Sequence, residues 1–206
     1  VKTFAGSGEP GFANGAAATA RFKRPYAVAV GPRGRVYVAD TENHRVRVIE
    51  GGRVSTLAGS GISGALDGPG VLARFKQPRG LAVDAADVVF VADMANHRIR
   101  RIRRGVVSTL AGSEAGFRDG SAQSALFNSP VDVAVDAGGR IYIADMANQR
   151  VRLLAGGVVS TFAGGREAGT RDGHVGEARF HWPQGVAVSA DDVFVSDTFS
   201  HRLRRI

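Results

Sequence analysis

Short apolar runs of strand length follow one another along the chain. Where they alternate with polar residues, the period is two residues rather than 3.6, which predicts strands and not helices. Polar or glycine-containing segments such as 103–105 (RRG) separate the runs and are typical of hairpin turns. One stretch thus predicts four antiparallel strands joined in sequence. These strands are expected at residues 80–84, 88–93, 98–102 and 106–111.

The same pattern recurs four times at a spacing of 52 or 53 residues, as the differences 78 − 25 = 53 and 130 − 78 = 52 show for one proline. A four-stranded unit repeated around an axis is a β-propeller, so we expect an all-β propeller of four-stranded antiparallel blades. Residues 1–206 are expected to form one domain. The repeats are roughly 1–52, 53–105, 106–157 and 158–206, and the proline stands at Pro25, Pro78, Pro130 and Pro183.

The two ends of the chain favour a ring over a solenoid of stacked hairpins, which is the alternative architecture. Residues 1–6 (VKTFAG) match the fourth strand of a unit, whereas residues 201–206 (HRLRRI) match the third. We therefore expect the N-terminal strand to complete the last blade, which would cover two exposed sheet edges. This exchange works equally well within one chain or between two. A monomer and a homodimer by strand exchange both stay open.

The motifs within a unit resemble the NHL repeat, which is named after its Asn-His-Leu tract. The resemblance rests on residues 78–84 (PRGLAVD), 89–93 (VFVAD) and 96–100 (NHRIR), and related residues occur in all four units. Gln149 replaces the histidine in the third unit, and Phe199 departs from the pattern in the fourth. The resemblance is to the long-loop variety found in large bacterial and cell-surface proteins, and it implies a propeller used mainly for binding. Six blades are common in this family, whereas this chain has sequence for four.

Long connections between units indicate where binding would occur. The segment between the fourth strand of one unit and the first strand of the next, for example Gly59 to Gln77, is about 20 residues long, and loops of this length are usually functional. In an antiparallel meander these connections lie at the same end as the turn between the second and third strands. An Asn-Gly or Asp-Gly pair in each connection is predicted to cap a short helical turn. We expect the long-loop face to bind a protein or small ligand.

Candidate ligand-binding residues are sought where equivalent positions differ, because residues copied in every unit are expected to be structural. Just before the first strand the four units read KRPY, KQPR, NSPV and HWPQ. Aromatic and cationic side chains at such positions suit recognition. The candidate ligand-binding residues are Arg24, Tyr26, Gln77, Arg79, Asp132, His181, Trp182 and Gln184.

The net positive charge raises the possibility that the protein binds nucleic acid. Lysine and arginine number 27 against 19 acidic residues, which gives a net charge of +8. Many arginines fall on the third strand of each unit, where we expect a solvated outer strand and a pair between Asp40 and Arg45, with equivalents in the other units. Single-stranded RNA binding through a basic surface, which the resemblance makes possible, is the alternative function and is not favoured.

Little in the sequence indicates catalysis. Cysteine is absent, which excludes disulfides and thiolate sites, and Asp132 is the only carboxylate among the apolar first strands. We therefore expect no catalytic residues, no metal and no cofactor. A lyase or lactonase with a channel metal, by resemblance to six-bladed enzymes, is the second alternative. No apolar stretch is long enough for membrane insertion. The start at Val1 is expected to reflect a processed product or a part of a longer protein, and no compartment is predicted.

Overall fold

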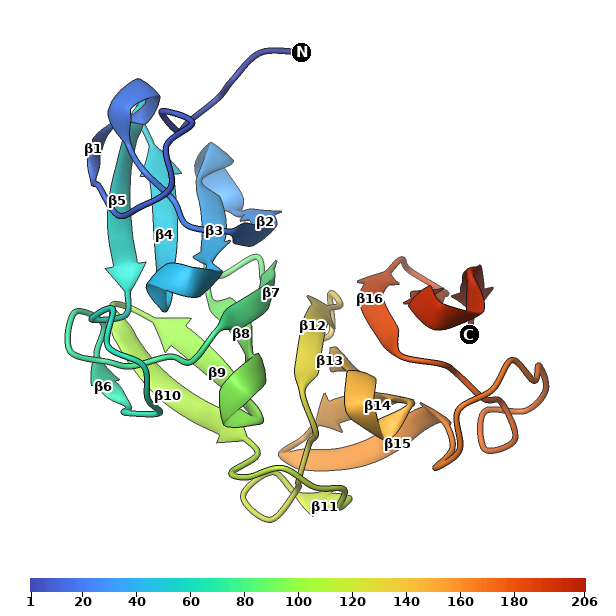
Figure 1. The fold of residues 1–206 in the computed structure, drawn as a ribbon. Helices are drawn as coiled ribbons and strands as arrows, with labels where there is room; N and C mark the ends of the chain where they lie inside the picture. The colour runs from blue at the N-terminus through green and yellow to red at the C-terminus, as the bar shows by residue number, and fades with distance from the viewer.

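Apolar alternation in each unit produces a meander of hairpin-linked strands. A computed structural model describes all residues 1–206 and contains four antiparallel sheets, arranged as successive propeller blades (Figure 1). The predicted all-β propeller is thereby confirmed. Each of the first three blades has four long strands in sequence order and a short fifth strand at its outer edge, contributed by the connection that precedes the blade.

The strand bounds follow the repeat closely. The first blade contains β1 (Gly15–Ala16), β2 (Pro25–Val30), β3 (Val36–Asp40), β4 (Arg45–Glu50) and β5 (Arg53–Ala58). The second contains β6 (Gly68–Pro69), β7 (Pro78–Val83), β8 (Val89–Asp93), β9 (Arg98–Arg103) and β10 (Val106–Ala111). The third contains β11 (Gly120–Ser121), β12 (Pro130–Val135), β13 (Ile141–Asp145), β14 (Arg150–Ala155) and β15 (Val158–Gly164). The fourth contains β16 (Pro183–Val188), β17 (Val193–Asp197) and β18 (Arg202–Arg205).

Helical structure is limited to short 3-10 turns. Four of them connect the second and third strands of a blade, and each ends on a residue in the left-handed conformation, His44, His97, Gln149 or His201. None of these turns has the length or the apolar character that a membrane span requires. The turns are η1 (Ala17–Thr19), η2 (Pro32–Gly34), η3 (Thr41–Asn43), η4 (Met94–Asn96), η5 (Met146–Asn148) and η6 (Thr198–Ser200).

The blades form an open arc. Figure 1 shows β2 and β16, the innermost strands of the first and last blades, on opposite sides of an opening. The fourth sheet has three strands, and residues 1–6 belong to no strand. The expected completion of the last blade by the N-terminal strand is therefore not made in this structure. The reason is the open curvature of the arc, which keeps the N-terminus away from the C-terminal blade (Figure 1).

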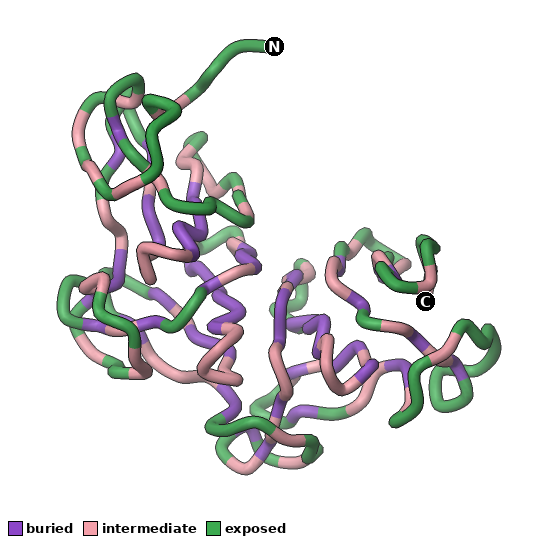
Figure 2. Tube along the Cα trace, viewed as in Figure 1, coloured by how far each residue is buried: buried purple, intermediate pink, exposed green.

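The hydrophobic core lies between successive blades. The largest cluster joins Phe90 and Ile99 of the second blade to Phe127 and Ile143 of the third, and similar clusters fill the other two junctions (Figure 2). Each blade thus covers the apolar face of its neighbour. The end blades lack one neighbour, and Val30 on β2 is 68% exposed as a result.

Buried arginines on the third strand of each blade correct the expectation of a wholly solvated strand. Arg47, Arg100 and Arg152 are fully buried, and Arg204 is nearly so. Arg100 donates to the Asp93 carboxylate at 2.7 Å and to the carbonyls of Arg74 and Leu66 in the preceding connection. The period of two predicts which side chains share a face of the sheet, but it does not predict what covers that face. Here the long connection before the blade folds over the face and its carbonyls accept hydrogen bonds from the arginine.

The predicted ion pair therefore involves a different arginine. Asp40 pairs with Arg47 at 2.6 Å, whereas Arg45 donates to the Ser60 carbonyl. The same Asp40 carboxylate also accepts the backbone N–H of Lys23 at 2.7 Å, just before the first strand. This set recurs in every blade and fixes the start of the first strand against the end of the second.

The acidic residue of the Asp-Gly pair also differs from expectation. Asp67 does not cap a helical turn but binds Arg100 at 2.6 Å and accepts the backbone N–H of Thr109 at 2.9 Å. Asp119 repeats this arrangement with Arg152 and Thr161. The pair thus attaches each long connection to the third and fourth strands of its blade.

Candidate functional site

The rim before each first strand is held in an unusual backbone conformation. Arg24, Gln77, Ser129 and Trp182 all have positive φ values, between 48° and 55°. At three blade junctions the backbone N–H of the positive-φ residue donates a hydrogen bond to the side chain that ends the 3-10 turn of the preceding blade. Gln77 donates to His44 Nδ1 at 3.2 Å, Ser129 donates to His97 Nδ1 at 3.0 Å, and Trp182 donates to Gln149 Oε1 at 2.7 Å.

These bonds place the rim at the same end as the long connections. The amide of Asn96 in the η4 turn donates to the Gly64 carbonyl of the connection at 2.7 Å, and Asn43 and Asn148 do the same in their blades. Burial lowers the pKa of His44 and of His97, which favours the neutral imidazole that these junction bonds need.

Four of the candidate residues meet between the first and second blades. The Arg79 guanidinium lies 4.2 Å from the centre of the Tyr26 ring, a cation–π contact, and Arg24 is paired with Glu42 at 2.9 Å. The hydrogen bond from Arg24 is the main cause that lowers the pKa of Glu42. A small pocket of about 110 Å³ is lined by Arg24, Tyr26, Thr41, Glu42, Gln77 and Arg79.

Two further candidates form a separate aromatic group on the fourth blade. The Trp182 ring lies 4.9 Å from the ring of Phe199, and His181 lies 5.5 Å from the same ring, measured between centroids. Phe199 is half exposed and was not predicted from the sequence, although its departure from the repeat is visible there. Gln184 lies on β16 and is partly buried. Because β16 and β2 face each other across the opening, the structure does not bring the two groups together (Figure 1).

Asp132 occupies a different environment from the rim residues. Its carboxylate accepts the backbone N–H of Val186 at 3.0 Å, which joins β12 to β16 of the next blade. On its other side lies Gly80, where any Cβ atom would overlap the Asp132 carboxylate. Burial raises the pKa of Asp132 to about 6, against the effect of the two backbone N–H donors Val186 and Val133. Asp132 thus joins neighbouring blades and does not line the pocket that Arg79 and Tyr26 share.

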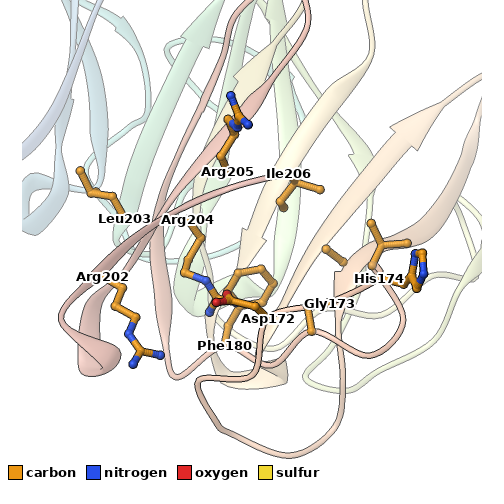
Figure 3. Close-up of a pocket in the computed structure, with 12 residues that line it drawn as sticks. Asp172, Gly173, His174, Phe180, Arg202, Leu203, Arg204, Arg205 and Ile206 are labelled. Atoms are coloured by element: carbon orange, nitrogen blue, oxygen red, sulfur yellow. The ribbon is translucent and has the colours of Figure 1, made fainter.

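The largest pocket lies elsewhere, along the outer edge of β18. It measures about 610 Å³ and is bordered by Gly173, Phe180, Leu203 and Arg204 (Figure 3). No group of three or more histidine, aspartate or glutamate side chains in residues 1–206 is arranged to hold a metal ion.

The repeats match a known family model. The model described as NHL repeat matches residues 22–49, 75–102 and 127–152, which are the first three units. Human NHL repeat-containing protein 2 is 28% identical over 84% of this chain. The chain spans 28% of the length of that relative, 16% of the chloroplastic protein SUPPRESSOR OF QUENCHING 1 of Arabidopsis thaliana and 6% of mouse teneurin-4.

Solved structures share the fold. An auxiliary nutrient binding protein from Bacteroides ovatus superposes with a TM-score of 0.71 at 20% identity, over 90% of this chain and 48% of that one. A gluconolactonase from Xanthomonas campestris superposes with a TM-score of 0.62 at 21% identity, over 87% of this chain and 57% of that one. The repeated Asn-His turn, the four-stranded blades and these matches lead to one conclusion: the chain belongs to the NHL-repeat family.

Proposed function

We propose that residues 1–206 act as a non-catalytic binding or scaffolding module that recognises a protein segment on the long-loop face. The observation that carries the proposal is the contrast between repeated and unrepeated polar residues. The arginines that recur in every blade are buried in ion pairs with aspartates, as Arg47 is with Asp40. Among the residues that differ between blades, Tyr26 and Trp182 are exposed at the rim, and the Arg24 side chain is 80% exposed.

The exposed set has the composition of a recognition surface. Tyr26 is 53% exposed and stacks with Arg79, so both side chains are held in place before any ligand arrives. Tyrosine, tryptophan and arginine are the residues that most often dominate binding energy at protein interfaces. Trp182 with Phe199 offers a second apolar contact on the fourth blade.

The alternatives have less support. Nucleic acid binding needs a stripe of accessible cations, and four arginines of the third strands are taken up by buried pairs with aspartate. A metal-dependent lactonase or lyase would need convergent ligands, whereas the one carboxylate of the innermost strands, Asp132, binds backbone N–H groups.

A peptide selection tests the proposal. Peptides enriched from a displayed library on the immobilised chain are measured by calorimetry against Tyr26→Ala, Arg79→Ala and Arg53→Ala. Arg53 is exposed at the opposite end of the first blade and is the matched control. We expect a tenfold or greater loss for the two rim variants, corresponding to about 1.4 kcal/mol, and none for the control. Equal affinities for all variants, or salt-sensitive binding of a uridine 20-mer in place of peptides, would contradict the proposal.

A further inference from the structure

An equivalent groove lies on each side of the second blade, at the end of the sheets opposite to the rim. The first groove separates the first and second blades and measures about 360 Å³. The middle groove separates the second and third blades and measures about 580 Å³. Hairpin turns of the following blade contribute residues 86–87 and 104–105 to the first groove, and residues 139 and 156–157 to the middle groove.

Polar side chains cross the blade junction in the first groove. The Tyr37 hydroxyl donates to Asp87 Oδ1 at 2.7 Å, and Arg35 is paired with Asp87 Oδ2 at 2.8 Å. The equivalent positions of the middle groove carry no polar side chain; they are Val88, Phe90 and Gly139. No such clamp therefore joins the second and third blades, and the middle groove is the wider of the two.

The floor of the middle groove is apolar and belongs to the core between the second and third blades. Four side chains that line it are only 4% to 7% exposed and belong to the largest hydrophobic cluster: Val88, Phe90, Ile141 and Leu154. Small-molecule sites are typically clefts of about 300 to 1,000 Å³ with an apolar lining and a few polar groups. The middle groove has the size and the floor of such a site.

An arginine stands on the wall of the middle groove where the neighbouring blades carry apolar residues. Arg101 is opposite Phe90 on the adjacent strand, so both side chains lie on the face that the third blade covers. The equivalent residues Val48 and Leu153 pack against the cores of their own junctions. Arg101 thus places a cation at a position that is otherwise used for apolar packing.

The cations of the middle groove lack a counterion within the protein. Arg101 and Arg103 both line the groove, but the ion pairs of the second blade engage Arg100 and Asp87 instead. Asp84 is the one acidic residue of the lining, and its Oδ1 accepts two backbone N–H groups of its own turn. Two arginines against one aspartate leave the groove positively charged, which favours an anionic ligand.

We propose that the middle groove binds a small amphipathic carboxylate. The apolar body of this ligand lies on the floor formed by Phe90 and Ile141, and its carboxylate accepts hydrogen bonds from Arg101. An alkyl chain and an aromatic ring both satisfy this chemistry and are separated by experiment. The site is at the opposite end of the blades from Tyr26 and Arg79, so it is independent of the protein segment proposed above for the rim.

A titration with two acids and their amides tests the site. Octanoate, naphthalene-2-carboxylate and the corresponding neutral amides are added to the ¹⁵N-labelled chain, and the amide resonances are followed by NMR. We expect saturable shifts at Gly139, Gly156 and Gly157, which border the groove. At least one acid should bind about tenfold or more tightly than its amide, because only the acid forms a charge-assisted bond with Arg101. The tighter of the two acids identifies the apolar body.

Two single variants with the same change of charge separate the groove from the rest of the surface. Arg101→Leu introduces the residue that the third blade has at this position, Leu153, so the fold is expected to be retained. We expect it to weaken binding of the acid about tenfold or more and to leave the amide unaffected. Arg104→Leu lies outside the middle groove, on an exposed turn, and should leave both affinities unchanged.

A third variant closes the groove with the clamp of the first junction. Val88→Arg/Phe90→Tyr/Gly139→Asp introduces the three polar residues, and Asp87 already shows an aspartate with φ +62° where Gly139 has φ +78°. We expect this chain to keep its circular dichroism spectrum and to lose binding of both acids. Absence of saturable binding by either acid, equal affinities for acids and amides, equal affinities of Arg101→Leu and Arg104→Leu, or full binding by the folded triple variant would each overturn the proposal.

Discussion

His97 and Ser129 join the second and third blades through one hydrogen bond, in which His97 Nδ1 accepts the backbone N–H of Ser129 at 3.0 Å. The bond holds Ser129 in its left-handed conformation at the start of the next blade. An imidazole can accept at Nδ1 only while that nitrogen is unprotonated. The stability of this junction is therefore tied to pH, and the junction at His44 is tied in the same way.

Replacing both histidines by glutamine should remove part of the acid sensitivity. Burial is the main cause that lowers the pKa of His44 and of His97 in the folded chain. A lowered folded pKa contributes stability above the unfolded value of about 6.5, and this stability is lost as pH falls through the folded value. Gln149 already makes the same junction with an amide. We expect His44→Gln/His97→Gln to lose less unfolding free energy than the original chain between pH 7.5 and pH 5, measured by urea denaturation. An identical loss in both proteins would contradict this.

Asp132 should have the opposite pH dependence. Its folded pKa is raised to about 6, so its contribution is fully present below the unfolded value of about 3.9 and is lost as pH rises through 6. Asp132→Asn resembles the protonated acid and can still accept the Val186 N–H. We expect the variant to be more stable than the original at pH 8 by on the order of 2 kcal/mol, and of similar stability at pH 4. Urea denaturation at the two pH values measures the difference, and a variant that is less stable at pH 8 would show that the charged carboxylate is needed.

Removal of a buried arginine should be costly. Arg100→Ala leaves the Asp93 carboxylate buried without its cation, and burial already raises the pKa of Asp93 against the effect of Arg100. We expect a loss of about 3 to 5 kcal/mol in the free energy of unfolding. Arg103→Ala, on the same strand but exposed, is the control and should change stability by about 0.5 kcal/mol or less. Similar losses of unfolding free energy for the two variants, measured by thermal or urea unfolding, would mean that the buried ion pair contributes no more to stability than an exposed arginine.

Alanine substitutions at two glycines with nearly the same backbone conformation can separate the cost of backbone strain from the cost of steric overlap. Gly8 has φ +89° with open space around it, and Gly112 has φ +87° where a Cβ would overlap the His97 carbonyl. Gly8→Ala should cost about 1 to 2 kcal/mol from its left-handed conformation alone. Gly112→Ala should cost clearly more, because the η4 turn or the strand must shift. Equal melting temperatures for the two alanine variants would indicate that the turn yields without cost.

Much of the fold could be predicted from the sequence because hairpins are local. The period of two within a unit and the 52 to 53-residue spacing between units identified the strands, the four blades and the family. The rim positions were also recognisable, since they differ between otherwise similar units. Four of the predicted site residues, Arg24, Tyr26, Gln77 and Arg79, do line one pocket.

Other features depended on contacts between distant segments. The burial of Arg100 follows from a connection that places the Leu66 carbonyl over the strand, 34 residues away in the chain. Asp132 became a link between blades because Gly80 and Val186 approach it from both sides. The division of the rim into two groups follows from the opening between β2 and β16 (Figure 1).

The sequence by itself determined the repeated blade, because each hairpin depends on residues that are close together along the chain. Only the tertiary structure decided which arginines are buried and which residues link one blade to the next. These features depend on how one blade packs against the next, and the packing energy of a junction exists only when both faces are present.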